Sequence, residues 1–194
     1  MATADGTKGD ARHVLRARRR EIVAARDLAA DAEAIAVVVA GLPLRRAGTA
    51  LSYESLPHEP PTTALNAALR AAGHRVLVPI TLPDMRLDWC DPTDPDRAPL
   101  GIDSPRAADL AIIPALAVDT AGTRLGQGGG CYDRVLPMLR PGCPVLALLH
   151  PGEHTDEPLP RDPHDVPVTS VVTALGVAPV GTPGLGAPPP AGRI

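Results

Sequence analysis

The sequence predicts an α/β protein, a three-layer α/β/α sandwich with a largely parallel central sheet. Two runs, residues 110–113 and 145–149, are apolar throughout, which is typical of strands that are covered on both faces. Other strand-like runs alternate with connections rich in turn residues, as in α/β proteins. Sheets of this kind bind ligands at the carboxyl ends of their strands, so we expect the functional site at that edge.

The first helical region covers residues 11–40. Asp10 is a candidate N-cap, and apolar residues recur at near-helical spacing up to Val39. We expect this region to divide into two helices and to end at Gly41. A strand over residues 49–53 should follow.

The rest of the chain predicts one further helix and a series of strands. After a proline-rich loop at residues 56–61, Thr62 or Thr63 caps a helix that ends near residue 72. The remaining short apolar or β-branched runs predict strands at residues 75–79, 86–89, 110–114, 145–149 and 169–173.

The chain divides into one domain and two tails. We expect a flexible N-terminus over residues 1–9 that carries Lys8, and a single domain over residues 10–173, since 194 residues suit one domain with a sizeable core. Ten of the last 21 residues are Gly or Pro, and the apolar residues among them have no periodicity. Residues 174–194 are therefore predicted to be a disordered tail.

Composition and charge exclude several classes of protein. The formal net charge of −3 argues against a nucleic-acid binder, whose affinity would come from a basic face. No run approaches the roughly 20 apolar residues that cross a bilayer, and the N-terminus lacks the apolar region of a signal peptide. The three cysteines match neither zinc nor redox motifs and fit a reducing compartment. We expect a cytoplasmic monomer that acts on small molecules.

A local basic run lies in the first helical region. Its members are Arg12, Arg16, Arg18, Arg19 and Arg20. On a helix these side chains point in several directions, so we interpret all but Arg12 as a solvated surface.

The most informative segment is the loop over residues 124–134, Arg-Leu-Gly-Gln-Gly-Gly-Gly-Cys-Tyr-Asp-Arg. Four of the five residues 126–130 are glycine. Glycine lets backbone N–H groups approach anionic oxygens, so that successive amides form a concave nest for phosphate. Arg124 would add charge-assisted hydrogen bonds, and Asp133 could hold a hard metal ion against the same phosphates.

The common glycine fingerprints do not match this loop. A P-loop needs Lys followed by Ser or Thr after its last glycine, where this chain has Cys131 and Tyr132. A G-x-G-x-x-G motif would need a small residue where Cys131 or Asp133 stands. The loop is therefore a nucleotide loop of another kind or, alternatively, a glycine-rich turn between strands without a ligand. The functional side chains that flank it favour the first interpretation.

Together these features resemble the 5-formyltetrahydrofolate cyclo-ligase family, also called methenyltetrahydrofolate synthetase. The resemblance covers about residues 8–173, and the loop with its Tyr132-Asp133 end is the most specific part. The other matching elements follow in order: Lys8-x-x-x-Arg12, Glu59-x-x-Thr62, Pro79 after a strand, residues 109–114, and His164-Asp165 before the strand that ends in Thr173.

The resemblance implies an ATP-dependent ring closure of 5-formyltetrahydrofolate to 5,10-methenyltetrahydrofolate, with ADP and phosphate as products and Mg²⁺ as cofactor. An N-formyl oxygen is a poor leaving group, so in the family's scheme it first attacks the γ-phosphorus of ATP. The N10 nitrogen then attacks the resulting iminium phosphate, and phosphate departs. Positioning and charge neutralisation must supply most of the catalysis.

The resemblance also implies roles for individual residues. Those implied to be catalytic are Lys8, Arg124 and Asp133. Those implied to hold Mg²⁺ are Asp133 and Asp165, and those implied to bind the folate are Glu59 and Tyr132. The implied ATP-binding set is Lys8, Arg12, Arg124, Leu125, Gly126, Gln127, Gly128, Gly129, Gly130, Cys131 and Tyr132. Taken singly, Asp165 also suits a turn, Glu59 a helix start and Lys8 an exposed surface.

Some positions depart from the family pattern. Cys131 stands where most relatives have a tyrosine, which removes a surface for stacking the folate, and Gln127 stands where Tyr, Phe or Arg is frequent. Ser104 replaces a glutamate, for which Asp103 could substitute. Two alternatives therefore stay open. The chain could be a non-catalytic folate- or nucleotide-binding relative, or an ATP-dependent enzyme of the same fold acting on another N-formyl or amide substrate.

Overall fold

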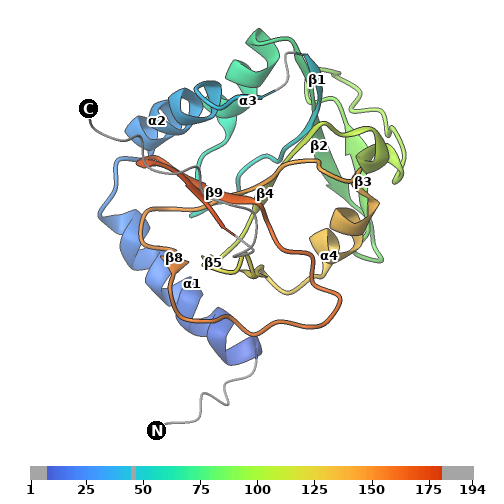
Figure 1. Cartoon of the computed structure of the whole chain (residues 1–194). Helices are drawn as coiled ribbons and strands as arrows, with labels where there is room; N and C mark the ends of the chain where they lie inside the picture. Colours follow the sequence, from blue (N-terminus) through green and yellow to red (C-terminus); the bar gives the residue numbers. More distant parts are fainter. Residues whose placement is uncertain (1–7, 45–46, 181–194) are drawn as a thin grey trace, which may run out of the picture.

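A seven-stranded, mostly parallel sheet forms the centre of the computed structural model, which describes residues 8–44 and 47–180 (Figure 1). Its strand order is β10-β9-β7-β4-β1-β2-β3; the five inner strands run parallel and the two edge strands antiparallel to their neighbours. The strands are β1 (Gly48–Leu51), β2 (His74–Thr81), β3 (Leu87–Cys90), β4 (Leu110–Pro114), β7 (Val145–Leu148), β9 (Ser170–Thr173) and β10 (Gly176–Pro179). The predicted α/β class with a largely parallel central sheet is confirmed.

Four α-helices flank the sheet in the described part of the chain: α1 (Lys8–Ala24), α2 (Leu28–Ala40), α3 (Thr63–Ala71) and α4 (Cys131–Val135). Two short 3-10 helices accompany them, η1 (Ser104–Ala107) and η2 (Leu136–Met138). The first helical region divides as expected, because the Asp27 side chain accepts hydrogen bonds from the N–H groups of Ala29 and Ala30 and so caps α2. The prediction that Asp10 precedes the first helix is wrong: α1 already includes Lys8, while residues 1–7 lie outside the described residues.

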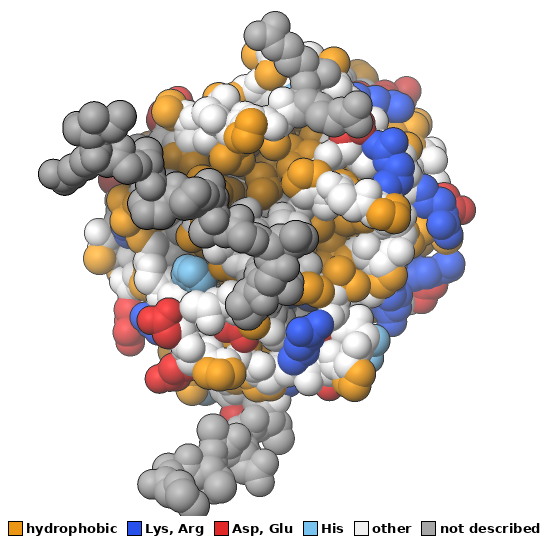
Figure 2. Space-filling view, viewed as in Figure 1, with side chains coloured by type: hydrophobic (Ala, Val, Ile, Leu, Met, Phe, Trp, Pro, Cys, Tyr) orange, Lys and Arg blue, Asp and Glu red, His pale blue; other side chains and the backbone are white. Residues whose placement is uncertain are grey.

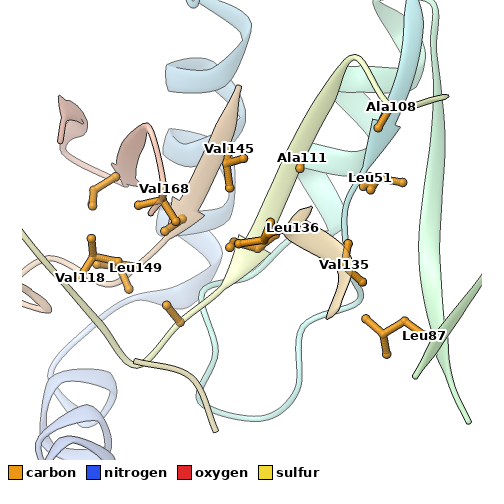
Figure 3. Close-up of a cluster of buried hydrophobic side chains, with 14 of the residues drawn as sticks. Leu51, Leu87, Ala108, Ala111, Val118, Val135, Leu136, Val145, Leu149 and Val168 are labelled. Carbon is orange, nitrogen blue, oxygen red and sulfur yellow. The ribbon is translucent and has the colours of Figure 1, made fainter. Parts of the chain in front are cut away.

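Two apolar clusters hold the helices against opposite faces of the sheet. Along β4, Leu110 and Ile112 belong to the cluster beneath α2 and α3, whereas Ala111 and Ile113 belong to the cluster beneath α4 and η2. Figure 3 shows the second cluster, in which Val135 and Leu136 approach the sheet near Leu51 and Ala111. The continuous apolar pattern of the sequence is therefore explained by coverage on both faces.

An apolar cavity of about 530 Å³ lies between α2 and α3, with Val39, Leu65 and Leu69 in its walls. Figure 2 shows apolar side chains gathered around a hollow on the face that Figure 1 presents. His74 is the one titratable side chain among the described residues that line this cavity. Such a lining does not suit a phosphorylated ligand.

A second, smaller sheet was missed by the sequence prediction. It consists of β6 (Arg124–Leu125), β5 (Ala117–Asp119) and β8 (His154–Thr155), in that order. Strands of two or three residues carry no periodic signal. Arg19 of α1 bonds to Glu153, which directly precedes β8, so this sheet lies against the first helix, and its strand β6 starts the glycine loop.

The predicted disordered tail begins too early. Residues 176–179 form β10, which pairs with β9 along the edge of the central sheet, so the prediction is wrong for this part of the segment 174–194. Residues 181–194 lie outside the described residues. The helices that the structure describes include none that is long and apolar enough to span a membrane.

Candidate active site

A cavity of about 580 Å³ opens at the carboxyl ends of the parallel strands, the edge expected from the sequence. Tyr53 follows β1, Thr81 ends β2 and Ala115 follows β4, and all three line the cavity. Every residue to which the resemblance assigned a catalytic, binding or metal role also lines it: Lys8, Arg12, Glu59, the loop from Arg124 to Asp133, and Asp165. The fold thus brings into one cavity residues that lie far apart in the sequence.

The glycine loop presents unused backbone donors to this cavity. Gly128 has φ +108°, and Gly130 has φ +67° and forms the N-cap of α4. Within residues 8–44 and 47–180, none of the N–H groups of residues 126–130 donates a hydrogen bond to a protein acceptor. Free N–H groups in a loop with positive-φ glycines can bind an anion.

Replacing Gly128 by alanine should weaken nucleotide binding. The backbone at φ +108° disfavours any side chain, and the new Cβ would lie 3.5 Å from the Arg12 guanidinium. A strain of about 1–3 kcal/mol should lower the ATP affinity by about 5- to 150-fold, which a measurement of equilibrium binding detects. Gly126→Ala is the matched control, because nothing lies within 4 Å of its added Cβ. Equal affinities in the two variants would contradict the proposed loop geometry.

Basic side chains from one face of α1 hold this loop. Arg12 Nε donates to the carbonyl of Gly126 at 3.0 Å. Arg16 donates twice to Gln127, to the side-chain Oε1 at 2.9 Å and to the carbonyl at 2.7 Å. The interpretation of Arg16 as a solvated residue is therefore wrong, since it fixes the loop to the helix.

Lys8, one turn before Arg12, faces two carboxylates. Its Nζ lies 2.6 Å from Asp162 Oδ2 and 2.9 Å from Asp165 Oδ2. Burial lowers the pKa of Lys8, but the hydrogen bonds from Lys8 to both aspartates raise it more, so the net pKa lies above its ordinary value. Lys8 therefore stays charged at neutral pH, and it is part of an ordered helix rather than of a flexible N-terminus.

Arg124 and Asp133 form a second ion pair on the opposite side of the loop. Arg124 is 9% exposed, and its Nη2 atom lies 2.5 Å from Asp133 Oδ1. The Nε–H of Arg124 is buried and has no partner among the described residues. The guanidinium thus has a donor to spare for a ligand in the cavity.

A group of possible metal ligands lies at the Lys8 end of the cavity. Asp162, His164 and Asp165 each place a ligand atom within 4.8 Å of the others. Burial raises the pKa of Asp165, but hydrogen bonds from the Asp162 N–H and from Lys8 outweigh it, and the pKa lies below its ordinary value. Asp133 is not in this group. The resemblance implied Asp133 and Asp165 as the metal ligands, and no sequence pattern indicated Asp162.

Glu59 and two aromatic side chains also line the cavity. Glu59 is 7% exposed, and its Oε2 accepts a hydrogen bond from the Leu56 N–H at 2.9 Å. Burial raises the pKa of Glu59 above its ordinary value. Both tyrosines of the chain, Tyr53 and Tyr132, line the cavity, and their hydroxyls are buried without a partner in the described structure. Asp103, the expected substitute for the glutamate that Ser104 replaces, pairs with Arg106 at the surface and does not line the cavity.

A buried network connects α1 to the strands behind the cavity. Arg19 donates to both carboxylate oxygens of Glu153, at 2.6 and 2.7 Å, and to the carbonyl of Ala115. Glu153 also accepts from the His150 N–H, and the His150 ring contacts the carbonyl of His58, next to Glu59. The interpretation of Arg19 as a solvated residue is therefore wrong, and the sequence pattern indicated no role for Glu153. Only the fold brings them together, since 134 positions separate them.

Comparisons with known proteins agree on one family. Residues 4–174 match the model of the 5-formyltetrahydrofolate cyclo-ligase family. A 5-formyltetrahydrofolate cyclo-ligase of Mycolicibacterium smegmatis is 34% identical over 160 residues, which cover 74% of this chain and 81% of the relative.

Solved structures support the fold. A 5,10-methenyltetrahydrofolate synthetase from Mycoplasma pneumoniae superposes with a TM-score of 0.68 at 21% identity, over 84% of this chain and 98% of that one. An Aquifex aeolicus 5,10-methenyltetrahydrofolate synthetase gives a TM-score of 0.70 at 20% identity, over 96% and 99% of the two chains.

Proposed function

Because the chain belongs to the 5-formyltetrahydrofolate cyclo-ligase family and is an ATP-dependent ligase, we propose that its activity resides in the cavity at the carboxyl edge of the sheet. The reaction converts 5-formyltetrahydrofolate and ATP into 5,10-methenyltetrahydrofolate, ADP and phosphate. The observation that carries the proposal is the set of unused amides of residues 126–130, which face the same cavity as Lys8, Arg12 and Arg124.

The first chemical step places most of its charge on phosphate. The formyl oxygen bonds to the γ-phosphorus while the bond to the ADP oxygen breaks, and ADP leaves with the electron pair. Lys8 and Arg124 are the cations positioned to neutralise that charge, and the loop amides hold the remaining oxygens. In doing so, Lys8 exchanges its bonds to Asp162 and Asp165 for bonds to phosphate.

The second step closes the ring. N10 attacks the activated formyl carbon, the carbon–oxygen bond breaks, and phosphate leaves with the electron pair while N10 loses its proton. Glu59 would hold the pterin, together with Tyr132 of the loop. The enzyme's main contribution to this step is to align N10 with the formyl carbon and to exclude water.

The oxygen donors of Asp162 and Asp165 fit a magnesium ion, which prefers hard oxygen ligands and retains several waters. When bound, the ion would neutralise phosphate charge. Asp133 is held by Arg124, so it would act on the ion after that pair opens. The cytoplasmic location and the monomeric state stay predictions from the sequence.

A coupled assay tests the proposed function. Purified protein with Mg²⁺, ATP and 5-formyltetrahydrofolate should release ADP and form the methenyl product, which absorbs light that the substrate does not. Tight folate binding without product would instead indicate a non-catalytic relative. ADP release only with another N-formyl or amide compound would indicate a different substrate.

A further inference from the structure

Tyr53 has a polar group for which the protein provides no partner. The residue is 3% exposed, and in the described part of the structure its hydroxyl makes no hydrogen bond although it is buried. A buried donor without a partner costs about 1–3 kcal/mol, whereas phenylalanine would fill the same space without that cost. Such a group calls for a functional reason.

The ring of Tyr53 is fixed from behind. It packs in the apolar cluster that contains Leu65 and Leu69 of α3. Its carbonyl accepts a hydrogen bond from Asn66 Nδ2 at 3.0 Å, and Asn66 is in turn bonded to Ser52 at 2.6 Å. Burial in this cluster restrains the ring, and the hydrogen bond to the carbonyl restrains the backbone, so the hydroxyl has a defined position.

The hydroxyl lies near Glu59 and Tyr132 of the cavity and near the buried Arg19–Glu153 pair. Burial raises the pKa of Tyr53 well above its ordinary value, and the nearby Glu59 carboxylate and Tyr132 raise it further. At neutral pH the hydroxyl is consequently protonated and can donate. Glu59, by contrast, offers acceptor oxygens, of which Oε2 already accepts from Leu56.

We propose that Tyr53 recognises the folate substrate by donating a hydrogen bond from its hydroxyl to the pterin ring beside Glu59. This inference rests on the function proposed above. One edge of a pterin presents the 2-amino group, N3–H and the 4-oxo group, in the order donor, donor, acceptor. A carboxylate matches the two donors, and a phenolic O–H matches the acceptor. The corresponding edge of adenine places an acceptor beside one amino donor, which a carboxylate does not match.

The few aromatic residues of the chain are concentrated at this cavity. The chain has two tyrosines, one tryptophan and no phenylalanine, and Cys131 removes the tyrosine expected in the loop. Both tyrosines nevertheless line the same cavity, from elements far apart in the chain. Tyr53 therefore supplies an aromatic contact that the loop lacks.

The test is Tyr53→Phe, which keeps the ring and removes the hydroxyl. The KM for 5-formyltetrahydrofolate should rise about tenfold, because the 4-oxo group loses a donor in a buried site. The KM for ATP should stay the same, and the melting temperature should not fall. The affinity for a 4-amino-4-deoxy folate analogue, which has no 4-oxo acceptor, should change much less.

Three results would overturn the assignment. An unchanged folate KM would show that the hydroxyl does not reach the substrate, a lower melting temperature would show a structural role, and a selective rise in the KM for ATP would place adenine there. Product formation by the unmodified enzyme is measured separately. Its absence would count against the function, while equilibrium folate binding by both proteins still tests Tyr53.

Discussion

Lys8→Met should reduce kcat/KM by about 10²–10³-fold. This is the usual effect of removing one preorganised group that stabilises the charge of a transition state. Methionine keeps much of the length of the side chain and supplies no charge to the transferred phosphate. Folding should be unaffected, since Lys8 lies in the first turn of α1 and its ion pairs are partly exposed, where such pairs contribute little. Steady-state kinetics and thermal melts of the same preparations measure both effects.

Lys8→Arg is the control for charge alone. It keeps the cation but changes its shape, so it should recover part of the loss in kcat/KM. Asp162→Asn tests the exchange of partners, because it removes one carboxylate that holds Lys8 before ATP binds. A Lys8→Met enzyme with near-normal kcat/KM would exclude Lys8 from the catalytic machinery.

Arg19→Met should destabilise the fold by about 3–5 kcal/mol, the usual cost of leaving one partner of a buried ion pair uncompensated. Arg19 and Glu153 have side-chain exposures of only 4% and 2%. The carbonyl of Ala115 also loses its donor. For a chain of this size the melting temperature should fall by about 10 °C. Chemical denaturation gives the free energy of unfolding directly.

An exposed ion pair supplies the matched control. Arg97 donates to both oxygens of Glu54, as Arg19 does to Glu153, but both side chains are largely exposed. Arg97→Met should therefore cost at most about 1 kcal/mol. The double variant Arg19→Met/Glu153→Leu should regain much of the lost stability, because it removes the buried charge as well. Equal effects of the two arginine substitutions would contradict the importance of burial.

The central sheet could be predicted because its strands carry a strong local signal. The runs at 110–114 and 145–149 are apolar without alternation, and the structure places them in adjacent parallel strands covered on both faces. The strand at 117–119 could not be predicted, because three residues show no periodic pattern. Strand β10 could not be predicted either, because the glycine and proline content of its sequence is typical of disorder. Pairing with β9 overrides that composition.

The candidate phosphate-binding loop was visible in the sequence, since its glycines, Arg124 and Asp133 lie in one short segment, and the structure places that segment in the cavity. The contacts between distant segments of the chain could not be predicted. Asp162 meets Lys8 across 154 positions, and Arg16 meets Gln127 across 111. No local sequence pattern marks such pairs. For this reason the sequence predicted Arg16, which holds the loop, and Arg19, which is buried, to be solvated.

The central claim is that the amides of residues 126–130 hold the triphosphate. An amide NMR titration with Mg-ATP tests it most directly, by following the chemical shift and hydrogen exchange of each of these N–H groups. We expect large shifts and slowed exchange at Gly126, Gly128, Gly129 and Gly130, whose N–H groups have no acceptor in the described protein. Saturating nucleotide that leaves these amides unshifted and still exchanging freely would contradict the account.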